Sequence, residues 1–277
     1  MKQITRYPGS KWSISEWIID HFPANYEKMV YLEPFFGSGA VFFRKAPSAV
    51  ETINDLDSDV VNLFAVIRDR PEQLARALEL TPYSREEYNR AFDPGGDPVE
   101  QARRFVIRTA QAIGAKMSGK CGWRNHKQIR VGGSAYLWHG IPDAVMDAAS
   151  RLRGSATNAV QIEHTDALHL IERHNDPGVL MYLDPPYLHG TRKGGRLYRH
   201  EMDDAGHRKL LELLQTSRAS IVLSGYESDL YDRALVGWHK YVICARTTSA
   251  EMTQEVIWCN YEAPEQQICI VEQEDEP

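Results

Sequence analysis

The stretch Tyr31-Leu32-Glu33-Pro34-Phe35-Phe36-Gly37-Ser38-Gly39-Ala40 decides the fold. Its start belongs to an apolar segment, residues 29–33, that is typical of a buried β-strand, and a turn with two glycines follows. Glycine lets a backbone pass close to a ligand, and open α/β sheets bind ligands at the carboxyl ends of their strands. A Gly-x-Gly turn alone is weak evidence, because a plain tight turn has the same composition and the third glycine of the dinucleotide fingerprint is missing.

Strands and helices alternate along most of the chain. We expect further strands at residues 50–54, 160–163, 178–183, 219–223, 241–244 and 255–260, and helices at 57–68, 71–80, 84–92, 99–114, 143–153, 167–173 and 206–215. This alternation predicts an α/β fold with a mainly parallel sheet covered on both faces. Residues 71–153 interrupt it and predict an inserted, mainly helical subdomain, with a loop or hairpin at 118–140. Residues 1–70 and 154–277 would then form the sheet domain.

An acidic residue ends the second expected strand. Asp55 follows the strand at 50–54 and lies sixteen positions beyond Gly39, close to the spacing at which an acid holds ribose hydroxyls in such sheets. The ordinary alternative is a helix N-cap, which Asp57 fits better. Asp55 is therefore our candidate for binding a ribose.

The segment Asp184-Pro185-Pro186-Tyr187 follows the apolar strand at 178–183. Two prolines fix φ and supply no N–H donors, so they leave carbonyl oxygens free in a rigid loop. Asp184 and the Pro185 carbonyl can then both accept from an exocyclic amine, and Tyr187 can stack on a base taken out of a duplex. The alternative is a proline-rich loop with a surface tyrosine. The strand at 178–183 disfavours this alternative, because a buried strand places the loop at the same sheet edge as the glycine turn.

Taken together, these blocks resemble the amino-group DNA methyltransferases. The segment Arg6-Tyr7-Pro8-Gly9-Ser10-Lys11 resembles the opening motif of the Dam-like adenine methylases, the D12 class of bacteria and phages. Residues 81–87, 224–226 and 255–260 fit that class in the same order, so the resemblance runs from about Tyr7 to Asn260 and is weakest between residues 92 and 159. It implies a Rossmann-like S-adenosylmethionine-dependent methyltransferase sheet, with the insert as target-recognition subdomain.

The resemblance also implies an activity and a set of site residues. The activity is site-specific transfer of a methyl group from S-adenosylmethionine to the N6 amine of a flipped adenine in duplex DNA. The catalytic residues would be Asp184, Pro185, Pro186 and Tyr187. The cofactor would be bound by Tyr7, Lys11, Glu33, Pro34, Phe35, Gly37, Gly39, Asp55, Asp166 and Asp184, with Lys11 near its carboxylate and Asp166 near its adenine. The chain departs from the class at Ser38, where relatives often carry glycine.

The expected reaction is direct displacement of the sulfonium methyl by the adenine amine. Hydrogen bonds to Asp184 and the Pro185 carbonyl would expose the nitrogen lone pair and accommodate its growing positive charge. Neither a metal nor a covalent enzyme intermediate is needed, and the chain has no Cys beside a Pro for cytosine C5 chemistry. The alternatives are a cytosine-N4 methylase, an RNA or protein-glutamine methylase, and a catalytically silent DNA-binding module.

Basic residues are concentrated in one acid-free stretch. Residues 101–142 carry eight Lys or Arg and no Asp or Glu, so the rest of the chain holds −14 of a total charge of −6. A basic face on an acidic body is typical of phosphate binding, although any single surface charge can simply be solvated. Residues 191–196 add a second basic cluster. We therefore expect double-stranded DNA as the partner, contacted by Arg103, Lys116, Lys120, Arg124, Lys127, Arg130, Arg192, Lys193 and Arg196.

Composition excludes several other classes of protein. No run of eighteen apolar residues occurs, which disfavours a membrane span, and the first residues lack the apolar region of a signal peptide. A cytoplasmic location is expected. The four cysteines have no metal-site spacing, so we expect neither a zinc site nor a disulfide framework.

Overall fold

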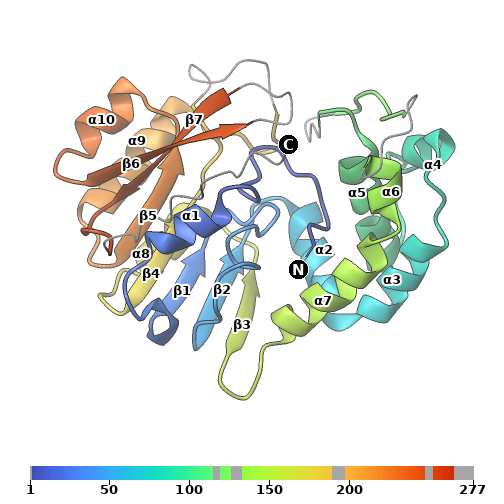
Figure 1. Cartoon of the computed structure of the whole chain (residues 1–277), viewed down its shortest axis with the longest axis horizontal. Coiled ribbons are helices and arrows are strands. Elements are labelled where there is room, and N and C mark those ends of the chain that lie inside the picture. The colour runs from blue at the N-terminus through green and yellow to red at the C-terminus, as the bar shows by residue number, and fades with distance from the viewer. Residues whose placement is uncertain (1, 115–118, 126–132, 189–196, 247–251, 265–277) are drawn as a thin grey trace, which may run out of the picture.

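The computed structural model describes residues 2–114, 119–125, 133–188, 197–246 and 252–264 (Figure 1). Its seven strands form one sheet in the order β3-β2-β1-β4-β5-β7-β6. The strands are β1 Val30–Glu33, β2 Val50–Asn54, β3 Ala159–Glu163, β4 Val179–Leu183, β5 Ser220–Gly225, β6 His239–Arg246 and β7 Met252–Cys259. The first five are parallel, and β7 runs antiparallel to both β5 and β6. The predicted mainly parallel α/β sheet is confirmed.

The described residues also form ten α-helices. They are α1 Ser15–Asp20, α2 Ser58–Asp69, α3 Pro71–Glu79, α4 Arg85–Arg90, α5 Pro98–Gln111, α6 Ser134–Trp138, α7 Ile141–Arg153, α8 Ala167–Arg173, α9 Asp204–Gln215 and α10 Asp229–Ala234, with a 3-10 turn η1 at Tyr26–Lys28. The expected helices are all present. The expectation of only a loop or hairpin at 118–140 was wrong in part, because α6 lies within it.

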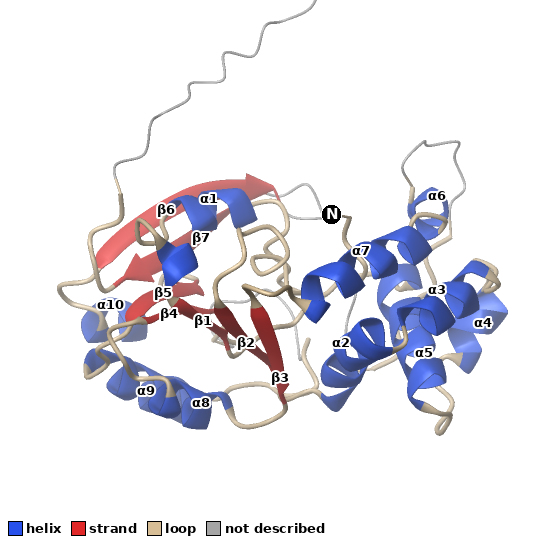
Figure 2. Cartoon of the chain, turned by 90° about the horizontal axis from the view of Figure 1, so that it is seen from below, coloured by secondary structure: helices blue, strands red, loops and turns tan. Residues whose placement is uncertain are grey.

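Alternating side chains of the central strands form two separate cores. Leu180 and Tyr182 of β4 face one side, whereas Val179, Met181 and Leu183 face the other. The first core includes residues of α1, α2, α5 and α7, and the second includes residues of α8, α9 and α10. Figure 2 shows α8 and α9 on one side of the sheet and α1 on the other. Burial on both faces explains why β4 is apolar throughout.

Helices α3 to α7 gather beyond the β3 edge of the sheet (Figures 1 and 2). Helix α2 connects them to the sheet, because it packs against α5 and α7 and also touches β3. Proline is the first residue of α3 and α5 and the second of α7, which favours the start of these helices. Ser84 caps α4 by accepting from the Glu87 amide.

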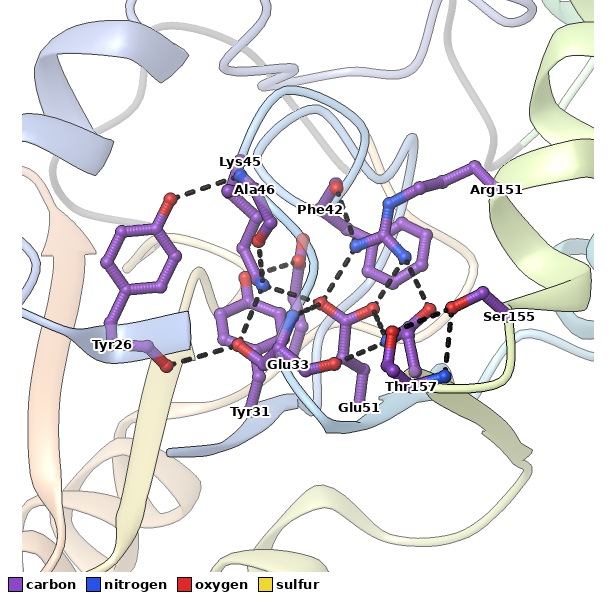
Figure 3. Close-up of polar contacts among 12 residues, drawn as sticks. Tyr26, Tyr31, Glu33, Phe42, Lys45, Ala46, Glu51, Arg151, Ser155 and Thr157 are labelled. Carbon is purple, nitrogen blue, oxygen red and sulfur yellow. Dashed lines mark hydrogen bonds and ion pairs between the residues drawn. The ribbon is translucent and has the colours of Figure 1, made fainter. Parts of the chain in front are cut away.

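A buried polar cluster fastens α7 to the sheet (Figure 3). The side chain of Glu51 on β2 is fully buried, and its carboxylate accepts from the ammonium of Lys45 at 2.5 Å. Arg151 of α7 donates to both oxygens of the same carboxylate, at 2.5 and 2.8 Å. Asn158, at the entry to β3, donates to it at 2.9 Å. One carboxylate thus joins two strands of the sheet to the last helix of the group beyond β3.

Candidate active site

A cavity of about 400 Å³ opens at the carboxyl ends of β1, β2 and β4. The parallel arrangement of these strands brings together residues that are far apart in the sequence. Of the predicted site residues, its wall contains Tyr7, Lys11, Glu33, Pro34, Phe35, Gly37, Asp55, Asp166, Asp184 and Pro186. Gly39, Pro185 and Tyr187 are outside this set.

The glycine turn after β1 is held by Asp55. Gly37 and Gly39 have φ of 51° and 65°, the left-handed region that favours glycine. The Gly37 amide donates to one Asp55 oxygen and the Asp57 amide to the other, each at 2.8 Å. A Cβ on Gly39 would come within 2.5 Å of the Phe36 ring, so this glycine serves the packing of the turn. Burial raises the pKa of Asp55 to about 6, against the lowering effect of the backbone donors.

Glu33 ends β1 as a buried carboxyl in the cavity wall. Tyr31 donates to its Oε2 at 2.7 Å. Burial raises the pKa of Glu33 to about 8; the hydrogen bond from Tyr31 lowers it, and the charge of Asp184 raises it further. The side chain is therefore poised to ionise when a cation arrives.

Lys11 and Asp184 form an ion pair in the middle of the site. The Lys11 ammonium lies 3.0 Å from Asp184 Oδ1 and donates to the Gly9 carbonyl at 2.7 Å. Burial raises the pKa of Asp184, and the positive charge of Lys11 opposes that shift. We expected Lys11 near the cofactor carboxylate, whereas here it contacts the acid of the predicted catalytic loop.

Tyr187 is buried rather than free to stack. Its ring is only 7% exposed and lies 4.5 Å from the Tyr226 ring, measured between centroids. Its hydroxyl donates to Glu255 Oε2 at 3.0 Å and lies 3.5 Å from Ser224 Oγ. The Lys11 ammonium sits over the ring, 4.7 Å from its centre. Stacking on a base would require this ring to expose a face.

One part of the wall was missed in the sequence. Tyr198 and residues 200–203 line the cavity, and Tyr198 lies beside the N-terminal segment. The Tyr198 hydroxyl donates to the Pro8 carbonyl at 3.2 Å, and Arg199 binds Asp57 at 2.9 Å and Asp59 at 2.6 Å. No local motif marks this segment, because every one of these partners lies more than 100 residues away in the chain.

The expected DNA contacts divide into three groups. Lys116, Lys127, Arg130, Arg192, Lys193 and Arg196 lie outside the described residues. Arg103 is mostly buried and donates to Glu87 at 2.8 Å and to Glu100 at 2.7 Å, which favours a structural role. Lys120 and Arg124 have no carboxylate within ion-pair distance in the described part of the chain, so they remain the candidates for phosphate contact.

Among the residues described, no group of three or more His, Cys, Asp and Glu could hold a metal ion, and no helix is long and apolar enough to span a membrane. Cys121, Cys244 and Cys259 form no disulfide within the described residues, and Cys269 lies outside them.

Comparison with protein families identifies the family of this chain. Residues 7–248 match the model of the D12 class N6 adenine-specific DNA methyltransferases. The chain belongs to this class. Membership confirms the predicted family, and the class acts as an adenine-specific DNA methyltransferase.

A curated relative supports the assignment to the D12 class. The chain is 26% identical over 281 residues to the Type II methyltransferase M1.LlaDCHI of Lactococcus lactis subsp. cremoris, covering 94% of this chain and 96% of the relative. Two solved structures of the rRNA methyltransferase AviRa of Streptomyces viridochromogenes align at 12% identity, with TM-scores of 0.40 and 0.39. They cover 91% of this chain and 85% and 86% of theirs.

Proposed function

We propose that this D12-class enzyme binds S-adenosylmethionine in the 400 Å³ cavity and methylates the N6 amine of an adenine flipped out of duplex DNA. One observation carries the proposal. Asp184, the acid of the catalytic loop, lines the same cavity as Gly37 of the glycine turn and Asp55 after β2. A bound cofactor and an incoming amine would thus meet at one sheet edge.

The residues of the cavity suit a cationic cofactor with a ribose. Seven carboxylates line the cavity against one lysine: Glu33, Asp55, Asp57, Asp166, Asp184, Glu201 and Asp203. Asp55 would bind the ribose, Asp166 would lie near the adenine, and Tyr7, Pro34 and Phe35 would supply apolar contacts. Gly37 lets Tyr7 approach, since a Cβ there would come 3.1 Å from the Tyr7 ring. When bound, S-adenosylmethionine supplies a methyl group activated by its sulfonium charge.

The catalytic loop would prepare the adenine amine for attack. Asp184 and the Pro185 carbonyl would accept hydrogen bonds from its two N–H groups, which favours a tetrahedral nitrogen and accommodates its positive charge. Pro186 keeps the loop rigid. Asp184 already pairs with Lys11 through Oδ1 and with the Tyr187 hydroxyl, so the amine would join two existing partners of this carboxyl group. Placement of the two reactants at one edge would supply much of the remaining rate enhancement.

We assign DNA recognition to residues 71–153 and catalysis to residues 1–70 and 154–277. Lys120 and Arg124 lie in the first unit, and Arg6, which precedes the cavity residue Tyr7, has its pKa lowered by burial and by the charge of Arg124. Neighbouring like charges of this kind favour a bound anion such as a DNA phosphate. By analogy with the Type II relative, we infer that the enzyme modifies one specific sequence, in the cytoplasm where host DNA lies, within a restriction-modification pair.

The proposal is tested by the product. The protein is incubated with duplex DNA and S-adenosylmethionine carrying a labelled methyl group, and the modified nucleoside is identified. We expect N6-methyladenine, no transfer by Asp184→Ala, and normal transfer by the control Asp176→Ala, whose side chain is 67% exposed. Label on cytosine, or no label in DNA, would overturn the proposal.

A further inference from the structure

The antiparallel strand β7 brings a further carboxyl group, that of Glu255, to the catalytic edge. Because β7 runs against β5, its first residues lie where the parallel strands end, and Val256 pairs with Gly225, the last residue of β5. Glu255 precedes Val256 and is partly buried. It is far from Asp184 in the sequence, yet the two carboxylates influence each other.

Glu255 holds the aromatic residue of the catalytic loop. Its Oε2 accepts from the Tyr187 hydroxyl at 3.0 Å, and it also accepts a hydrogen bond from Tyr226. The Tyr226 ring packs edge-on against the Tyr187 ring, and Ser224 Oγ lies 3.5 Å from the Tyr187 hydroxyl. The position of Tyr187 therefore depends on β7 and on the segment after β5, and not only on the two prolines.

The same carboxylate acts on the charge of Lys11. The Lys11 ammonium contacts Asp184 and the face of the Tyr187 ring. The negative charge of Glu255 also attracts it. Lys11 thus pairs directly with Asp184, while Glu255 lies at the hydroxyl of the tyrosine whose ring Lys11 covers and attracts Lys11 through its charge. If the charge of Glu255 were removed, Lys11 would keep its contacts with the Gly9 carbonyl, the Tyr187 ring and Asp184, but Asp184, the group that has to receive the adenine amine, would compensate more of its charge.

We propose that Glu255 is a positioning residue of the methyl-transfer site, which fixes the catalytic loop through the Tyr187 hydroxyl and shares Lys11 with Asp184. It acts through Tyr187 and Lys11 and does not touch the reacting atoms. The inference rests on the proposed function, because it assigns Asp184 to the adenine amine.

The test compares methyl transfer by the wild type, Glu255→Leu, Glu255→Gln, Tyr187→Phe and the double variant Glu255→Leu/Tyr187→Phe. Single-turnover rates on duplex DNA are measured together with the affinity for S-adenosylmethionine. Gln254→Ala, an exposed neighbour on the same strand, is the control. We expect Glu255→Leu to lower the rate on the order of 10- to 100-fold through misplacement of the loop, with a much smaller change in cofactor affinity.

The double variant separates a shared role from two independent ones. If Glu255 acts through Tyr187, the double variant is no slower than the slower single variant, because both remove one contact. Loss of rate by the product of the two single effects would overturn the inference. So would wild-type transfer by Glu255→Leu.

The acid limb of the pH–rate profile gives a readout that a structural role would not change. In the described chain, the titratable groups that act on Glu255 are Lys11, Tyr182, Asp184, Tyr187 and Tyr226. Glu255→Gln keeps an acceptor for Tyr187 but removes a negative charge near Asp184. We therefore expect Glu255→Gln to transfer methyl groups faster than Glu255→Leu, and to have the acid limb of its pH–rate profile at lower pH than the wild type.

An unshifted acid limb in Glu255→Gln would contradict the charge-sharing role, and this variant decides the question if Glu255→Leu fails to fold. Failure of the proposed function looks different. If the wild type forms no N6-methyladenine, both proposals fall. If the wild type forms it and the Glu255 variants match the wild type in rate and pH profile, only the inference falls.

Discussion

The buried Glu51 cluster predicts a large loss of stability when its one negative charge is removed. Glu51→Gln keeps the shape of the side chain but leaves the cations of Lys45 and Arg151 without their carboxylate. The side chains of Lys45 and Arg151 are 0% and 14% exposed, so water cannot replace the lost partner at Lys45 and does so poorly at Arg151. Breaking a buried pair from one side costs about 3 to 5 kcal/mol.

Thermal unfolding measures this cost. With about 2.1 cal/mol/K of unfolding entropy per residue, a chain of 277 residues loses about 5 to 9 °C in Tm for that free energy. Glu79→Gln is the matched control, because its pair with Arg76 is 60% and 64% exposed on the two side chains. We expect a shift of less than about 1 °C there. If Glu51→Gln melts within about 2 °C of the wild type, the cluster does not hold α7 to the sheet as argued.

Three further predictions concern the site and the DNA face. Burial raises the pKa of Glu33 from 4.5 in the unfolded chain to about 8 in the folded protein, so the folded state binds the proton more tightly between pH 4.5 and 8. The free energy of unfolding of the wild type therefore falls as the pH rises through this range. Glu33→Gln lacks this titration, so its Tm should rise relative to that of the wild type from the acid end of the range to the alkaline end. Gly39→Ala should cost about 1 to 3 kcal/mol in denaturant unfolding, more than Gly95→Ala, which has a similar positive φ but open space around it. Arg124→Gln should weaken DNA binding and reduce the slope of log affinity against log salt by about 1, whereas Arg104→Gln, already paired with Glu100, should leave the slope unchanged.

Elements with a strong local pattern were predictable from the sequence. The strand at 50–54 agrees with β2 at both ends, and the helix at 71–80 agrees with α3 within one residue. Helices α1, α6 and α10 were missed, and each has six residues or fewer. Such short helices are determined by tertiary packing, since a helix of one or two turns has little stability of its own.

The site was predictable where its residues follow strands. Glu33, Asp55 and Asp184 could be placed together because parallel strands end at one edge. Contacts that cross the chain could not be inferred, such as Tyr187 with Glu255 or Arg199 with Asp57.

The acid-free stretch misled us about charge for a similar reason. Its arginines Arg103 and Arg108 are neutralised by Glu87 and Asp59, which lie before it in the sequence. The charge of a segment can be counted from the sequence, but the acidic side chains that pair with it in the folded protein cannot.

Ion pairs attach helices α5 and α7 to the sheet domain. Asp184 and Asp55 are fixed by the ends of β4 and β2, so their positions depend on the sheet and not on the helices beyond β3. Those helices are tied to the sheet domain through two carboxylates, Glu51 with Arg151 and Asp59 with Arg108. Asp59 also binds Arg199 beside the cavity. We infer that loops between these helices can change, and with them the sequence recognised, while the ion pairs keep the bound DNA in register with the catalytic edge.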